Sequence, residues 1–178
     1  IASMSGNGRS FGTHHGSYKA STRVLTSDGA FPELDYWKYN NIREANYFLE
    51  KIQDSPLDQS LIDQRTAEVR FLRAYMYFQM VIRYGGVPLI LKPQAADAPA
   101  DEIFVARNSE KEIYDFIISE MSSISQILPA SSIQEKGRPS EMAALALKSR
   151  AAIFASSIAK YGTKQLNGLL GFDSSDAS

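Results

Sequence analysis

The sequence contains no cysteine among its 178 residues. A disulfide, a thiol nucleophile and a cysteine metal site are therefore excluded for these residues. The lack of cysteine does not identify the redox compartment of the protein, and an oxidising location is allowed. An excess of charge of either sign is also missing, because 19 basic residues stand against 20 acidic ones and the formal net charge is -1. This balance attracts no polyanion, so a nucleic-acid partner is not expected.

Long hydrophobic runs are absent too. No uninterrupted apolar run approaches the roughly 20 residues that cross a bilayer, and the polar stretch 1–17 has no signal-peptide core. We expect any export signal to have been removed. With 44% hydrophobic and 22% charged residues, the composition is that of a globular chain with one ordinary core.

Motifs for metal binding and nucleotide binding are scarce. His14 and His15 are adjacent rather than one helical turn apart, so they would not face one metal together, and no HExxH pattern occurs. The segment "GNGRSFG" lacks the Lys-Ser/Thr ending of a phosphate-binding loop. We predict no metal site and no cofactor.

Carboxylates are present, but in no recognisable catalytic pattern. A glycosidase needs two of them across a cleft, and the candidates are Glu33, Asp35, Asp97 and Asp101, whose separation the sequence does not reveal. The stretch "DAPADE" at 97–102 would bind calcium weakly or only keep a loop solvated, and solvation is the default. We therefore predict that the protein is not an enzyme.

The middle of the chain has helical periodicity. Apolar residues recur at three- and four-residue steps in four segments, about 39–52, 62–84, 109–128 and 140–161. Ser109 and Glu112 have the spacing of a capping box, and Gly85 with Pro88 forms a stop signal followed by an extended "VPLIL".

Each predicted helix has an apolar stripe that we expect to form the core. In the first helix the stripe is Tyr39, Ile42, Ala45, Phe48, Leu49 and Ile52. In the second it is Ala67, Phe71, Ala74, Phe78 and Val81, widened by Leu72, Tyr75, Met76 and Ile82. In the fourth it is Ala143, Ala144, Leu147, Ala151, Phe154 and Ile158.

The second and fourth helices match each other when their Tyr-Gly ends are aligned. Tyr77 then falls on Phe154, and the first and third helices correspond as well, so two helix hairpins repeat. A single pair cannot bury its apolar face alone, and stacked pairs resemble tetratricopeptide repeats. The predicted fold is all-α: a loop-rich segment 1–35, a tetratricopeptide-like region 36–162, and a loop 163–178 leading to a missing C-terminal half.

The order of these segments resembles one known family. "RTAEVRFLRAYMYFQMVIRYGGVPLIL" is similar to the segment that marks the SusD and RagB family of outer-membrane nutrient-binding lipoproteins. "YWKYNNIREANYFLEKI", "EIYDFIISEMSSISQILP" and "GRPSEMAALALKSRAAIFASSIAKYG" resemble the neighbouring family helices in the same order. Family members are considerably longer and carry a lipidated N-terminal cysteine, which this sequence lacks.

The arginines and tyrosines inside the marker segment allow two interpretations. One narrow helix face carries Arg70, Arg73 and Tyr77. These side chains would either contact a ligand or pair with carboxylates and with the backbone groups at helix ends of the protein itself. We favour the second, in which this helix is a scaffold for a loop surface.

The candidate ligand site lies where aromatic and polar residues meet irregular backbone, before and at the start of the first helix. It comprises Tyr18, Arg23, Tyr36, Trp37, Asn40 and Asn41. Sugar C–H faces stack on aromatic rings while hydroxyls need amide or guanidinium partners. By resemblance, Trp37 and the following Asn occupy the place of an aromatic platform and an amide in carbohydrate-binding members, and Arg23 would match an upstream arginine. The alternative is that Trp37 packs the helix start onto the core.

The resemblance also implies a function and partners. It implies a protein, lipid-anchored at the cell surface in the outer membrane of a Bacteroidota-type cell, that captures an oligosaccharide without turnover and delivers it to a SusC-like TonB-dependent transporter. The lipid anchor is absent from this chain. The alternative is a RagB-like peptide-binding or purely scaffolding partner of the transporter.

Overall fold

The computed structural model describes residues 36–95, 97–131, 135–162, 170–172 and 176. The chain divides into two compact units, Ile1–Trp37 and Lys38–Ser178, and the fold below is that of the second. Its elements are α2 (Tyr39–Lys51), the 3₁₀ turn η2 (Ile52–Asp54), α3 (Gln59–Tyr84), α4 (Ala100–Ile103), α5 (Glu110–Ile124) and α6 (Glu141–Tyr161). The described residues contain no strand. The all-α prediction is confirmed.

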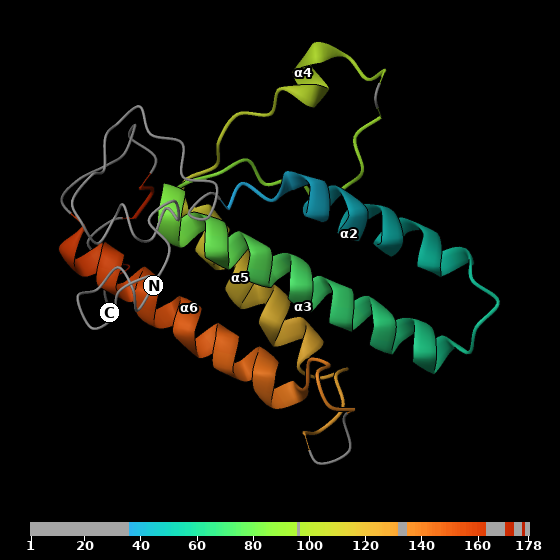
Figure 1. Ribbon diagram of the computed structural model, residues 1–178. Coiled ribbons are helices and arrows are strands. Elements are labelled where there is room, and N and C mark those ends of the chain that lie inside the picture. The colour runs from blue at the N-terminus through green and yellow to red at the C-terminus, as the bar shows by residue number, and fades with distance from the viewer. Residues whose placement is uncertain (1–35, 96, 132–134, 163–169, 173–175, 177–178) are drawn as a thin grey trace, which may run out of the picture. The chain divides into compact units, whose positions relative to one another are not determined.

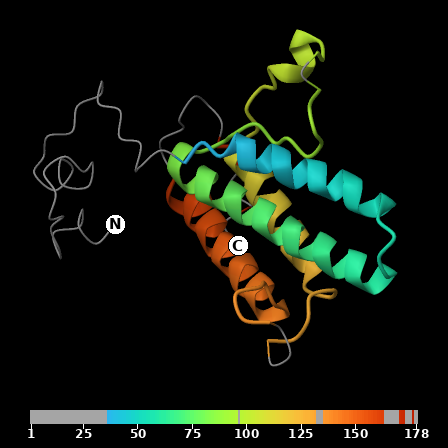
Figure 2. The same ribbon diagram turned by 45° about the vertical axis from the view of Figure 1, so that its right-hand side comes forward.

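The four long helices lie side by side, and successive helices run in opposite directions (Figures 1 and 2). α3 packs against both α2 and α5, and α5 packs against both α3 and α6. The two pairs, α2 with α3 and α5 with α6, are therefore stacked through α3 and α5, as the repeat of helix hairpins predicts.

Local signals set several helix ends. The Ser109 side chain accepts a hydrogen bond from the Glu112 amide, and the Glu112 carboxylate accepts one from the Ser109 amide, which makes the predicted capping box. Gly85 ends α3 with φ +69, and a Cβ there would meet Oε1 of Glu110 at 2.9 Å. α5 ends at Ile124, four residues before the predicted end at Leu128, and the intervening residues form turns and a bend.

The core lies along α3, α5 and the facing side of α6. Its fully buried members include Ala67, Ala74, Tyr77, Phe78, Ile113, Tyr114, Ile117, Met121, Ala144 and Ala151. The edge of the Phe78 ring meets the Phe154 ring at a centroid distance of 5.5 Å. An edge-to-face pair of this kind adds to the stabilisation from burial alone.

Several residues of the predicted stripes are exposed instead. Leu72, Tyr75 and Ile82 lie on the outer side of α3, Phe48 is exposed on α2, and Phe71 is only half-buried. Phe154 is 37% exposed, although its counterpart Tyr77 is fully buried. For the exposed side chains the prediction of a core position is wrong, whereas Ala67, Ala74, Phe78 and Val81 of the predicted stripe are buried. On α3 the reason is that Arg73 and Tyr77 occupy the side that faces α2, α5 and the segment after α3.

α6 is the helix among the described residues that is long and apolar enough to cross a membrane by length and composition. It carries Lys148 and Arg150 near its middle. Ala144, Leu147 and Ala151 on one side of it are buried, and the helix packs on α5. α6 therefore packs on the helix bundle along one side only.

Candidate ligand-binding site

The start of α2 holds four of the six predicted site residues. Trp37 lies just before the N-cap residue Lys38, and its side chain is 45% exposed. Asn40 and Asn41 are exposed in the first turn of α2, and Tyr36 is half-buried. Trp37 belongs to the first compact unit and the two asparagines to the second. A shared binding surface for these residues therefore stays a prediction.

Tyr18 and Arg23 lie outside the described residues, as do His14 and His15. The part of Tyr18 and Arg23 in the site stays a prediction from sequence.

The outer face of α2 continues the polar and aromatic character of its start. Glu44, Tyr47 and Lys51 follow Asn40 at steps of three and four residues and are all exposed. The Lys51 ammonium lies 5.7 Å from the centre of the Tyr47 ring. Tyr47 is not among the predicted site residues, although its spacing from Asn40, opposite the apolar stripe of α2, places it on the same helix face.

The arginines of α3 are paired within the protein. Arg70 donates two hydrogen bonds to the Glu120 carboxylate, from Nε at 3.0 Å and Nη2 at 2.7 Å. Arg73 donates from Nη1 to Oδ1 of Asn46 at 2.8 Å and to the carbonyl of Leu91 at 3.2 Å, and from Nη2 to Glu120 at 3.4 Å. Burial lowers the pKa of Arg73, and the nearby Glu120 carboxylate opposes that shift.

The hydroxyl of Tyr77 also forms its hydrogen bonds within the protein. Its hydroxyl donates to the carbonyl of Ile90 at 3.0 Å and accepts from the amide of Ile90 at 2.8 Å. Burial raises the pKa of Tyr77 to about 12, so the phenol is neutral and available for both bonds at physiological pH. The prediction that Arg70, Arg73 and Tyr77 serve the scaffold rather than a ligand is confirmed by these partners.

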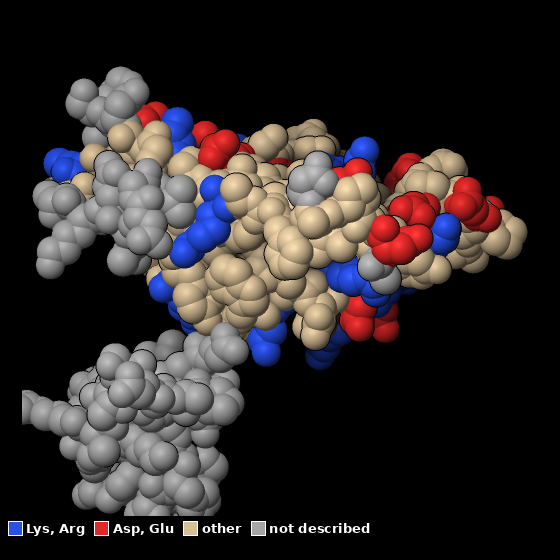
Figure 3. Space-filling view, turned by 90° about the horizontal axis from the view of Figure 1, so that it is seen from above, with Lys and Arg blue, Asp and Glu red and all other residues tan. Residues whose placement is uncertain are grey.

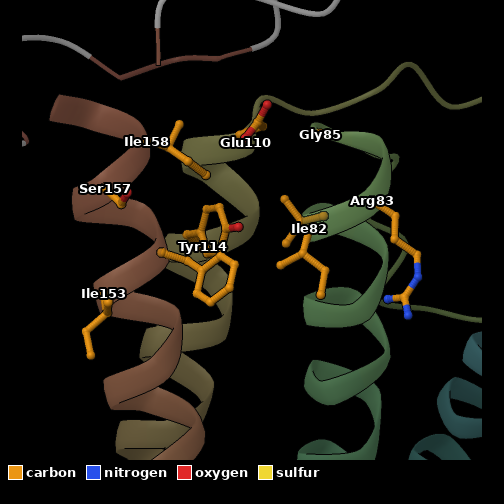
Figure 4. Close-up of a pocket in the computed structure, with 10 residues that line it drawn as sticks. Ile82, Arg83, Gly85, Glu110, Tyr114, Ile153, Ser157 and Ile158 are labelled. Carbon is orange, nitrogen blue, oxygen red and sulfur yellow. The ribbon is translucent and has the colours of Figure 1, made fainter. Parts of the chain in front are cut away.

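A hollow of about 480 Å³ opens between the C-terminal ends of α3 and α6 and the N-terminal end of α5 (Figure 4). Its apolar lining comes from Val81, Ile82, Ile153, Phe154 and Ile158, and its polar lining from Arg83, Glu110, Tyr114 and Ser157. The buried Tyr114 hydroxyl has no hydrogen-bond partner among the residues that the structure describes, and burial raises the pKa of both Tyr114 and Glu110.

This hollow suits an apolar occupant better than a sugar. Its walls are mainly aliphatic, whereas a hydroxyl-rich ligand needs several donors and acceptors beside an aromatic platform. Glu110 is the one carboxylate among the described residues that line it, so this part of the chain does not assemble the paired carboxylates of a glycosidase there. Within the described ranges, no group of three or more His, Asp or Glu side chains is close enough to hold a metal ion.

Comparison with known proteins gives consistent matches. A family model described as "Starch-binding associating with outer membrane" matches residues 7–153. A curated SusD-like protein of Formosa agariphila is 32% identical over 83 residues, which are 47% of this chain and 16% of that protein.

Solved structures match over most of the chain. A SusD-like protein of Bacteroides fragilis has 35% identity and a TM-score of 0.69, with 81% of this chain and 28% of that chain covered. A laminarin-binding SusD-like protein has 29% identity and a TM-score of 0.65, with 80% and 30% covered. The chain thus spans less than a third of the length of these relatives.

Proposed function

The chain belongs to the SusD-like family, and from that premise we propose that it takes part in capturing a glycan at the outer membrane without chemical turnover. The description of the matching family, which names starch binding and the outer membrane, supports this proposal. So does the similarity to a laminarin-binding relative. Anchoring by lipid at the cell surface and delivery of the glycan to a SusC-like TonB-dependent transporter are parts of the same proposal.

The observation that carries the proposal is the exposure of Trp37 and of the amides that follow it in the sequence. Large aromatic side chains are highly buried on average, yet Trp37 keeps 45% of its surface exposed. Asn40 and Asn41, three and four residues later, are exposed as well. A sugar would stack on the indole through its C–H face, while the amides donate to and accept from its hydroxyls.

The rest of the described chain fits the role of a support for this surface. α3 and α5 are joined by Arg70, Arg73 and Glu120, and the segment after α3 is tied to Tyr77. In the proposal, residues 36–162 form this rigid support, and residues 1–35, with Tyr18 and Arg23, contribute to the ligand surface. Binding on a rigid support loses less conformational entropy than binding on a mobile one.

A glycan array followed by calorimetry on the full-length protein tests the proposal. We expect saturable binding to one class of oligosaccharide, and recovery of that oligosaccharide unchanged after long incubation. Cleaved products would show an enzyme. Binding of peptides with no glycan retained would instead support the RagB-like alternative.

A further inference from the structure

The start of α2 lies beside the segment that follows α3. Both ribbon views show this segment, residues 87–92, leaving the end of α3 next to the first turn of α2 (Figures 1 and 2). The Tyr39 hydroxyl donates to the carbonyl of Pro88 at 2.6 Å. Further along α2, the Asn46 amide donates to the carbonyl of Ile90 at 2.9 Å. Side chains of α2 therefore bond the backbone of this segment at two places.

The two places are far enough apart to set the tilt of α2. Tyr39 and Asn46 are seven residues apart, which is two helical turns and about 10 Å along the helix axis. Their side chains therefore leave α2 on the same face. Two bonds at this separation fix both the position and the tilt of a helix, whereas a bond at one place alone leaves the helix free to pivot.

Asn46 is the firmer of the two attachments. Its side chain is 2% exposed, and its Oδ1 accepts a hydrogen bond from Arg73 at 2.8 Å. Its acceptor Ile90 is held from α3 as well, by the hydroxyl of Tyr77. Toward the start of α2, by contrast, the first buried residue is Ile42. If the bond at Tyr39 is lost, the first turn of α2 can therefore swing around the attachment at Asn46.

The bond at Tyr39 joins two uncharged groups. Burial raises the pKa of the Tyr39 phenol well above its ordinary value, because the charged phenolate is disfavoured there. The hydroxyl is therefore a donor throughout the physiological pH range. Figure 3 views the molecule from the side on which the segment after α3 lies, and mostly uncharged residues cover the middle of that face. A bond between neutral groups is screened little by salt.

We propose that Tyr39 is a positioning residue for the glycan surface. Its bond to Pro88 holds the first turn of α2, in which Asn40 and Asn41 follow and are exposed. This inference rests on the proposed function, because it takes the two asparagines as glycan contacts. A tilt of α2 by about 10° around Asn46 would carry them roughly 2 Å, whereas a binding site needs its groups held within about 0.5 Å.

The test compares Tyr39→Phe with Tyr77→Phe in the full-length protein. Each substitution removes one hydroxyl that bonds the segment after α3, but only Tyr39 belongs to α2. The probe for calorimetry is the oligosaccharide best retained on a glycan array that includes maltoheptaose and laminarihexaose. Well below the unfolding temperature, Tyr39→Phe should weaken binding of this probe about three- to tenfold. Tyr77→Phe should leave binding unchanged although it lowers the melting temperature.

Hydrogen exchange gives a second readout that needs no glycan. The Ile42 amide donates to the carbonyl of Lys38 at 3.1 Å and closes the first turn of α2. This amide should exchange faster in Tyr39→Phe than in wild type. In Tyr77→Phe its exchange should change only as much as the overall loss of unfolding free energy requires.

The outcomes separate the positioning role from the proposed function. Equal glycan affinity of wild type and Tyr39→Phe, or an equal loss of affinity in both variants, would overturn the positioning role while glycan capture stands. Unchanged protection of the Ile42 amide in Tyr39→Phe would overturn it too, because the bond to Pro88 would then not hold the first turn. A wild-type protein that retains no glycan on the array would contradict the proposed function instead, and the exchange of Ile42 would still show whether Tyr39 holds α2.

Discussion

The middle of α3 and the start of α2 carry the same kinds of side chain, aromatic rings beside hydrogen-bonding groups. In α3, Arg73 and Tyr77 are buried and bonded to the protein: Arg73 through its two terminal nitrogens to Asn46, Leu91 and Glu120, and Tyr77 to Ile90. At the start of α2, Trp37, Asn40 and Asn41 are exposed. Residue type therefore does not distinguish a scaffold from a candidate site, whereas burial and the identity of the partners do.

The largest expected loss of stability comes from the apolar side of α3. Phe78 is 1% exposed and packs edge-on against Phe154, so Phe78→Ala should lower the free energy of unfolding by about 3 to 5 kcal/mol. Phe71→Ala, at a half-buried site on the same helix, is the matched comparison and should cost clearly less. Urea denaturation measures both, and equal losses would contradict the burial pattern described here.

The next effect concerns the buried polar side of α3. Arg73→Ala removes the donor to Oδ1 of Asn46 and to the carbonyl of Leu91, whereas both oxygens of Glu120 still accept from Arg70. It should cost about 2 to 3 kcal/mol of unfolding free energy. Arg83→Ala, at an exposed position near the end of α3, should cost about 0.5 kcal/mol or less. If the folded Arg73→Ala protein lost glycan affinity instead of stability, α3 would belong to the site.

A smaller effect is expected from Tyr77→Phe. The substitution keeps the ring but removes the hydroxyl that bonds both the amide and the carbonyl of Ile90, so the loss should be about 1 to 2 kcal/mol. Native-state hydrogen exchange gives a local readout. The Ile90 amide should exchange faster in the variant. The exchange rates of amides within α5 should change only as much as the overall loss of unfolding free energy requires. Unchanged protection at Ile90 would mean that another acceptor replaces the hydroxyl.

The parts of the fold that sequence predicts best depend on neighbouring residues. The capping box at Ser109 and Glu112 and the end of α3 at Gly85 are set within a few positions. The capping box occurs as expected, and Gly85 ends α3 with a positive φ of 69, although its ψ of -142 is not that of a left-handed helix. How far the buried side of α3 extends around the helix was not predictable in this way, although the predicted stripe residues Ala74 and Phe78 are buried. Tyr75 looks apolar enough for the core, yet it is exposed, and Arg73 is buried because its partners lie on α5, on α2 and after α3.

For the candidate site too, the sequence predicts where the residues stand in the chain but not how exposed they are. The position of Trp37 at the boundary between loop and helix follows from sequence, as do the amides within a turn of it. The exposure of these side chains does not, because it depends on what packs over them. Phe104 is a sharper case, since nothing in "EIFVAR" indicates that its ring would stand outside the helices while Arg107 caps the end of α3.

The central claim is that α3 is scaffold and the start of α2 is ligand surface, and Trp37→Ala in the full-length protein tests it most directly. Glycan affinity by calorimetry and thermal unfolding are measured together, with Tyr161→Ala on α6 as an exposed aromatic control. Losing a stacking ring removes about 0.5 to 1.5 kcal/mol beyond simple burial, so affinity should fall at least several-fold while the melting temperature stays near that of wild type. A sharply lower melting temperature with unchanged affinity in the folded protein would contradict the account and make Trp37 a core residue.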